Sequence, residues 1–270
     1  MHEILPYLPY KISDRTPISQ ISACDFSWFH KVNKDFMMTT ETNKLTAYHF
    51  IYATFYILLV PGLVILISGD WLWIEGWIFA IWFLVLSLTT MIYLYRQDPG
   101  LLLERFKPPG SDNQKTWDKY FLYAIQILFW VWLVVMPLDA KRYAWSANFP
   151  SWLKVVGGIE LLISLFFLYR SFTDNSFLSP LVRIQSEREH RVVSTGVYGF
   201  VRHPMYLGAI FLFIGTPLLL GSLYGVLIGV IFSLVLVARI FGEEKMLVEE
   251  LPGYEDYQQK VKYRLIPFIW

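Results

Sequence analysis

Residues 203–244 read HPMYLGAIFLFIGTPLLLGSLYGVLIGVIFSLVLVARIFGEE, and this stretch decides the fold. Two apolar runs, Met205–Leu220 and Leu223–Ile240, are separated only by the Gly-Ser pair at 221–222, which is typical of a turn. Pro204 suits the first position of a helix, because its missing N–H would have no partner there. The stretch therefore predicts a tight hairpin of two apolar helices.

The two arms of this hairpin have nearly equal lengths. At 1.5 Å per residue, the arm that starts at His203 measures roughly 27 Å and the arm that returns to Glu243 roughly 32 Å. His203 is therefore expected at nearly the same level as Glu243 and Glu244. We expect these side chains to form a site at a solvent-exposed rim. Other polar residues lie close to that level in the sequence, namely Tyr198, Arg202, Tyr206, Glu249, Glu250, Lys260 and Arg264.

The composition places this hairpin in a membrane protein. Of the 270 residues, 55% are apolar and 17% charged, against about 25% charged in an ordinary soluble domain. A span needs about 20 mostly apolar residues, and a helix is the default because lipid leaves no partners for free backbone groups. Four further segments fit, namely Thr46–Ser68, Ile74–Tyr95, Tyr120–Met136 and Trp152–Leu168. We predict an all-α integral membrane protein with about six transmembrane helices.

The basic residues predict the topology. With six spans, all but three of the 23 Lys and Arg residues fall on one side, which the positive-inside rule makes cytoplasmic. Both termini are then cytoplasmic, and residues 69–73 and 137–151 face outside. We divide the chain into a cytoplasmic segment, 1–44, four transmembrane helices over 45–169, and a region 170–270 that holds the hairpin, the tail and the candidate site.

Composition also excludes several classes of function. The 23 basic residues are balanced by 22 acidic ones, so the chain lacks the basic excess of a nucleic-acid-binding protein. A single cysteine, Cys24, excludes an internal disulfide and a cysteine-based zinc site. No two histidines have i, i+4 spacing, and no glycine-rich phosphate loop is present. We therefore predict no metal site.

Two other features flank the hairpin. The connection 170–202 is long for a loop, and such loops are more often functional than idle. Within it, Leu181–Ile184 and Arg191–Ser194 are candidates to pair as short strands. After the hairpin, Tyr254, Tyr257 and Val261 have the i, i+3, i+7 spacing of one face of a short helix.

Structural roles for the candidate residues must be weighed too. An Arg-His pair before a membrane helix commonly anchors it by reaching phosphate groups. Two glutamates at the C-terminal end of a helix oppose its dipole, which hints at another purpose. These residues, taken alone, name no reaction.

The motif RHPMY at 202–206, followed one hairpin later by the pair Glu243-Glu244, resembles the R-H-P-x-Y…E-E signature of the isoprenylcysteine carboxyl methyltransferase family. The phospholipid N-methyltransferases share a related pattern. The sequence TGVY at 195–198 and the tail 253–267 extend the likeness over residues 171–270. The first 150 residues resemble the family only in being hydrophobic spans.

The resemblance implies an S-adenosylmethionine-dependent methyltransferase that acts on a lipophilic acceptor at the cytoplasmic membrane face. It assigns cofactor contacts to Gly196, Tyr198, His203, Tyr206, Glu243 and Glu244. Arg264 and Glu250 are its candidates for positioning the acceptor. The motif does not choose among a thiol, a carboxylate and an amine, so the acceptor stays open.

Two alternatives remain at this point. Sterol and steroid reductases also carry an H-P-x-Y-like element before a final hairpin, but they usually have Asn where this chain has Met205, and they lack the Glu-Glu pair. Binding of S-adenosylhomocysteine rather than NADPH would separate the two classes. A non-enzymatic scaffold or small transporter would predict charges within the spans, where Glu160 is the only acid well inside one.

Overall fold

The structure is a computed structural model that describes residues 44–270. Cys24 and the segment predicted over 1–44, except its last residue, lie outside the described residues. Five helices of the described part are long and apolar enough to cross a membrane: α2 (Ala47–Ser68), α3 (Ile74–Gln97), α5 (Thr116–Pro137) with its π-helical extension η2 (Leu138–Arg142), α6 (Ser151–Asp174) and α8 (Leu223–Glu250). The prediction of an all-α integral membrane protein is confirmed.

The sixth predicted segment forms the shorter helix α7 (Pro204–Leu220). Its 17 residues span roughly 26 Å, slightly less than the ~30 Å of hydrocarbon in a typical bilayer. Pro204 occupies the first turn, and Gly221 ends the helix with a φ of 84°, a left-handed conformation that glycine adopts readily. The Ser222 hydroxyl then accepts a hydrogen bond from the Gly225 N–H at the start of α8. The predicted hairpin is present.

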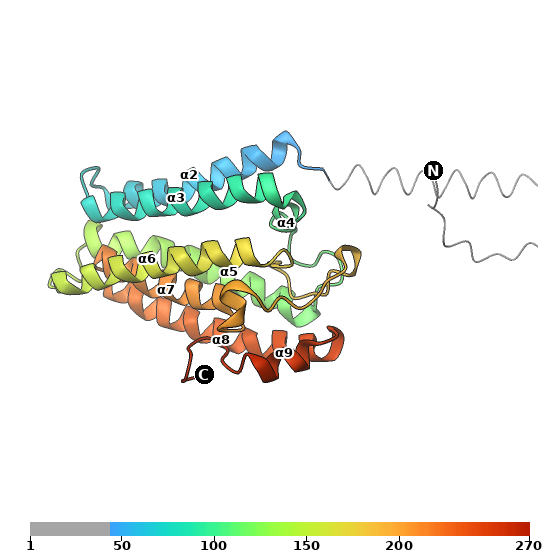
Figure 1. The fold of residues 1–270 in the computed structure, drawn as a ribbon. Helices are drawn as coiled ribbons and strands as arrows, with labels where there is room; N and C mark the ends of the chain where they lie inside the picture. The colour runs from blue at the N-terminus through green and yellow to red at the C-terminus, as the bar shows by residue number, and fades with distance from the viewer. Residues whose placement is uncertain (1–43) are drawn as a thin grey trace, which may run out of the picture. The chain divides into compact units, whose positions relative to one another are not determined.

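The connections of the described part gather at two ends of the helices (Figure 1). One end, called the η2 end, holds residues 69–73, 138–150 and 221–222. There the Lys154 ammonium at the start of α6 lies 2.6 Å from the Glu75 carboxylate at the start of α3. The other end, called the α9 end, holds α4 (Pro99–Glu104), the connections 105–115 and 175–203, and α9 (Tyr254–Lys260).

Close backbone contacts hold α6, α7 and α8 together. A Cβ added at Gly157 of α6 would lie 2.3 Å from the Leu219 backbone nitrogen, and one added at Gly229 of α8 would lie 2.1 Å from the Phe213 carbonyl oxygen. Small residues at such crossings let helices approach closely, which drives packing inside a membrane. The Phe213 and Phe232 rings stack beside this crossing with centroids 3.8 Å apart.

A buried carboxylate fixes the hairpin turn at the η2 end. Asp139 is fully buried and accepts hydrogen bonds from the hydroxyls of Ser146 and Ser222 and from the Tyr224 N–H. This network ties the end of α5 to the turn between α7 and α8. It therefore sets the level at which the two arms reach the opposite end.

The prediction of short strands in the long connection is wrong. Residues 175–203 carry only the 3₁₀ turns η3 (Ser186–Arg188) and η4 (Gly196–Gly199). The reason is that backbone groups of this segment are bonded by residues of the first turn of α5 and of the connection before it. The Val182 N–H donates to the Asp118 carboxylate, the Val182 carbonyl accepts from the Lys115 N–H, and the Ile184 carbonyl accepts from the Asn113 amide.

The helix predicted after the hairpin is present as α9. Tyr254, Tyr257 and Val261 are all buried and pack with Leu251 in a small cluster beneath the connection 175–203. The Tyr257 hydroxyl donates to the Tyr198 carbonyl at 2.7 Å, which fastens α9 to η4.

Candidate active site

Glu244 of α8 is the centre of a buried ionic cluster. Its Oε1 accepts a hydrogen bond from Arg202 Nε at 2.7 Å and lies 3.1 Å from His203 Nε2. Its Oε2 accepts a hydrogen bond from Arg264 Nε at 2.7 Å. One carboxylate, that of Glu244, therefore joins the motif at 202–206 to the tail. The spacing of the hairpin predicts that the motif and the Glu-Glu pair lie close together, but it does not predict the contact with the tail.

The tail buries this cluster. Four successive carbonyl oxygens, those of residues 261–264, accept hydrogen bonds of 2.7–3.0 Å from Arg202 Nη1 and from the backbone N–H groups of Arg202 and His203. His203 is 5% exposed and Glu244 4% exposed. The expectation of a solvent-exposed rim is therefore wrong for these two residues, because the tail lies over them.

A second chain of hydrogen bonds starts at Glu243. Its Oε2 accepts from the Tyr206 hydroxyl at 2.5 Å, and that hydroxyl accepts from Arg239 Nη1 at 2.9 Å. Arg239 Nε donates to Asp118 Oδ1 at 2.8 Å, and its Nη2 donates to the Pro180 carbonyl at 2.7 Å. The chain joins α7, α8, α5 and the long connection at one level of the α9 end.

A pocket lies between this second series of hydrogen bonds and the long connection 175–203. It encloses about 790 Å³ of empty space, part of it continuous with solvent, and its described lining falls within residues 175–257. The polar groups that line it include Tyr198, His203, Tyr206, Arg239 and Glu243. Among the described lining residues, Glu243 is the only acid.

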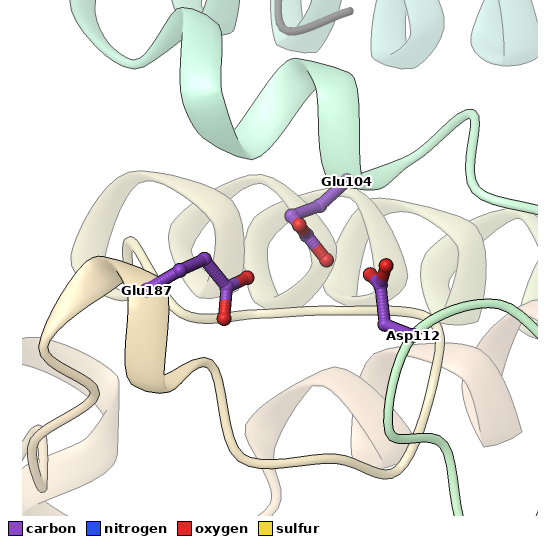
Figure 2. Close-up of side chains that lie close together, drawn as sticks. All are labelled: Glu104, Asp112 and Glu187. Carbon is purple, nitrogen blue, oxygen red and sulfur yellow. The ribbon is translucent and has the colours of Figure 1, made fainter. Parts of the chain in front are cut away.

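A group of ion pairs joins the pocket wall at 177–193 to the connection that follows α4. This group is called the ionic clasp and consists of Glu104, Lys107, Asp112, Arg183 and Glu187. Figure 2 shows its three carboxylates pointing toward one another, and each has an oxygen within 4.8 Å of the others. Lys107 Nζ lies 2.5 Å from Glu104 and 2.6 Å from Asp112, and Arg183 Nη2 lies 2.8 Å from Glu104 and 2.5 Å from Glu187.

The two cations already neutralise most of the charge of the three carboxylates, which makes the clasp an ion-pair network. Arg183 is 3% exposed and also lines the pocket. Through Arg183, the clasp thus ties this pocket wall to residues 104–112.

Tyr198 and Gly196 differ in their relation to the pocket. Tyr198 lines it, and burial raises the pKa of its hydroxyl well above the ordinary value, so it remains a neutral phenol. Gly196 is not among the lining residues. It has a φ of +59°, and an added Cβ would lie 1.9 Å from the Asp174 carboxylate, which accepts the Val197 N–H. Its observed role is to fit this turn against α6.

The two residues predicted to position the acceptor lie outside the pocket lining. Arg264 bonds Glu244, which is not a lining residue either, and its guanidinium lies over the rings of Phe241 and Trp270. Glu250 forms an ion pair with Lys115. The structure therefore does not bring Arg264 and Glu250 together with Tyr206 and Glu243.

His190 lines the same pocket from the long connection. Its ring stacks on Phe177 with centroids 4.8 Å apart. Burial, followed by the charges of Arg183 and Arg188, lowers the pKa of His190 to about 4. The ring is therefore neutral at physiological pH.

The sequence analysis gives no site role to Arg239 and Asp118, two residues of the hydrogen-bonded series that starts at Glu243. Arg239 enters the sequence analysis only among the basic residues that predict the topology, and Asp118 precedes the span predicted over Tyr120–Met136. One signal was available, because Arg239 stands four residues before Glu243 and so shares its helix face. The partner on α5, 121 residues earlier, has no comparable signal.

Comparisons with known proteins agree with the motif. A model of the phospholipid methyltransferase family matches residues 152–252. The protein-S-isoprenylcysteine O-methyltransferase of Schizosaccharomyces pombe is 31% identical over 217 residues, which cover 72% of this chain and 86% of that protein. The chain belongs to the protein-S-isoprenylcysteine O-methyltransferase family. Protein-S-isoprenylcysteine O-methyltransferase B of Arabidopsis thaliana is 29% identical over 151 residues, 54% of this chain and 71% of that protein.

Among solved structures, this family member is similar to a eukaryotic intramembrane Ras methyltransferase, isoprenylcysteine carboxyl methyltransferase. That likeness covers 94% of this chain and 88% of the other, with 21% identity and a TM-score of 0.49. Family membership itself rests on the sequence match. It confirms the resemblance drawn from residues 202–206 and 243–244, and it makes the chain an integral membrane methyltransferase. The reductase and non-enzymatic alternatives are thereby set aside.

Proposed function

We propose that this methyltransferase transfers a methyl group from S-adenosylmethionine to the carboxylate of a lipophilic acceptor of the S-isoprenylcysteine class. The observation that carries the proposal is the pocket at the α9 end of α7 and α8, where the carboxylate of Glu243 and the guanidinium of Arg239 are joined through Tyr206. The acceptor class comes from the names of the relatives.

The carboxylate of Glu243 can bind the ammonium group of the methyl donor. Tyr206 holds one oxygen of Glu243, which leaves Oε1 for the ammonium group of S-adenosylmethionine. Tyr198 and His203 line the same space and complete the donor's contacts. In this proposal Glu244 and Gly196 support the pocket rather than touch the donor, because their side-chain and backbone contacts are made within the protein.

The guanidinium of Arg239 can bind the carboxylate of an acceptor. The three hydrogen bonds of Arg239 use three of its five N–H groups, and two remain for a ligand. S-adenosylmethionine supplies a methyl group on a sulfonium, and the acceptor's carboxylate oxygen forms the new C–O bond as the C–S electron pair returns to sulfur. A carboxylate is already ionised at neutral pH, so this step needs no base. The chain's contribution is alignment of the two reactants.

The proposed topology puts this pocket at the cytoplasmic face. The α9 end carries the Lys and Arg residues of the connections 96–119 and 170–202 and of the tail, and the positive-inside rule favours the cytoplasm for that end. The methyl donor then enters from the cytosol. The acceptor's apolar part stays in the bilayer while its carboxylate reaches the pocket.

Calorimetry on the purified protein in detergent tests the donor. We expect binding of S-adenosylhomocysteine and no binding of NADPH. Glu243→Gln is expected to weaken S-adenosylhomocysteine binding by roughly 1.5–3 kcal/mol, the range for a hydrogen bond to a charged group, while Glu249→Gln, an exposed neighbour on α8, leaves it unchanged. Equal affinity in all three proteins would remove Glu243 from the donor site.

A further inference from the structure

We propose that Asp118 is a positioning residue for the acceptor's carboxylate, acting through Arg239. This inference rests on the proposed function. Asp118 lies in the first turn of α5, is 0% exposed and is not among the residues that line the pocket. It therefore does not touch the ligand, and any effect it has on catalysis must pass through a neighbour.

Its contacts join the two walls of the pocket. Oδ1 accepts the hydrogen bond from Arg239 Nε at 2.8 Å, on the hairpin side. Oδ2 accepts from the Val182 N–H of the long connection at 2.8 Å, and from Gln114 Nε2 of the connection before α5 at 2.7 Å. One carboxylate thus fixes both the guanidinium and the wall that faces it.

This arrangement determines which way Arg239 presents its remaining N–H groups. Its three bonds to Asp118, Tyr206 and Pro180 occupy one donor on each nitrogen and hold the guanidinium plane. Tyr206 and Pro180 contribute neutral acceptors, so Asp118 is the only carboxylate bonded to Arg239 in the described part of the chain. Without that charge, only two neutral acceptors would hold the guanidinium, and its remaining N–H groups would lose their fixed direction.

An asparagine cannot replace this carboxylate. All three groups around Asp118 are donors, and an amide offers one oxygen and one NH₂ group where the carboxylate offers two oxygens. In either orientation the NH₂ group faces an N–H donor. Because Oδ2 takes two of the three bonds, the amide oxygen is expected on that side, which leaves Arg239 Nε facing a donor.

The test compares two ligands that differ only in the group proposed to bind Arg239, which is a charged carboxylate in one and a neutral carboxamide in the other. We would measure dissociation constants for an N-blocked S-isoprenylcysteine and for its carboxamide, in lipid nanodiscs, with the S-adenosylhomocysteine affinity measured alongside. In the unaltered protein the acid is expected to bind at least about tenfold more tightly, since a charge-assisted bond contributes 1.4 kcal/mol or more. The ratio of the affinity for the acid to the affinity for the carboxamide is called the acid-to-amide ratio. Asp118→Asn should reduce this ratio to below about threefold while changing S-adenosylhomocysteine affinity less than twofold.

Glu104→Gln is the matched control, because Glu104 is also a buried carboxylate paired with an arginine that lines the pocket, Arg183. It should keep the acid-to-amide ratio. In an Arg239→Gln background, Asp118→Asn should lower the ratio no further, as expected when one residue acts only through the other. If Asp118→Asn cannot be purified, Asp118→Glu, which keeps the charge but displaces it, should reduce the ratio by about threefold or more.

Three results would contradict the inference alone and leave the proposed function standing. One is a full acid-to-amide ratio in the Asp118 variant, and another is an equal loss in Glu104→Gln, which would indicate general loosening. The third is a further loss in the Arg239→Gln background. Equal binding of acid and carboxamide by the unaltered protein would overturn the carboxylate acceptor itself, and with it the role of Asp118.

Discussion

Replacing Glu244 by Gln removes the charge at the centre of the buried ionic cluster. The carboxylate is 4% exposed and takes contacts of 2.7, 3.1 and 2.7 Å from Arg202, His203 and Arg264. Breaking a buried pair by removing one partner costs about 3–5 kcal/mol, because the remaining charge stays buried and uncompensated. The Arg264 side chain is 30% exposed, so water can solvate it, and we take the lower end of the range.

About 3 kcal/mol corresponds to a fall in melting temperature of roughly 6–12 °C for a chain of this size. The assay is thermal unfolding in detergent, followed by tryptophan fluorescence. Glu249→Gln is the matched control, because Glu249 is exposed on the same helix and surface changes usually stay within about 0.5 kcal/mol. A Glu244→Gln protein that melts within 2 °C of the control would refute the claim that this carboxylate holds the tail on the motif.

Three other predictions follow from the site and the topology. Tyr206→Phe removes the hydroxyl that joins Glu243 to Arg239 and should weaken S-adenosylhomocysteine binding by roughly 1–3 kcal/mol in calorimetry. In a cysteine-free background, an impermeant reagent added outside should label a cysteine at position Ala147 and miss one at Asn113; the reverse pattern would invert the topology. The lowered pKa of His190, about 4, means that the unfolded state binds more protons between pH 4 and 6.5, so stability falls as the pH falls through that window. His190→Gln should therefore lose less melting temperature between pH 7 and pH 5 than the unaltered protein does.

The helices and the hairpin could be predicted because their signals are local. Apolar runs of about 20 residues and the proline and glycine that bound α7 are visible in the sequence, and equal arm lengths place His203 beside Glu244 without any alignment. The burial of that pair could not be read in the same way. It depends on the backbone carbonyl groups of residues 261–264, and no side-chain pattern in the sequence indicates the bonds they accept from Arg202 and His203.

The long connection shows the same limit. Leu181–Ile184 has the composition of a strand, but its backbone is bonded by Asn113, Lys115 and Asp118, a segment some 65 residues earlier in the chain. Sequence patterns within the connection cannot reveal such partners. For the same reason the role of Asp118 emerges only once α5 and α8 are placed side by side.

Methyl-ester formation tests the central proposal most directly. The protein in lipid nanodiscs would be given S-adenosylmethionine with a labelled methyl group, together with an N-blocked S-isoprenylcysteine or a short-chain S-alkylcysteine with the same head group. We expect label in a base-labile methyl ester of the isoprenyl compound and little in the short-chain analogue, because the apolar part orients the carboxylate from the bilayer. Equal turnover of the two would contradict entry from the membrane. Binding of S-adenosylhomocysteine without any labelled ester would contradict the carboxylate acceptor.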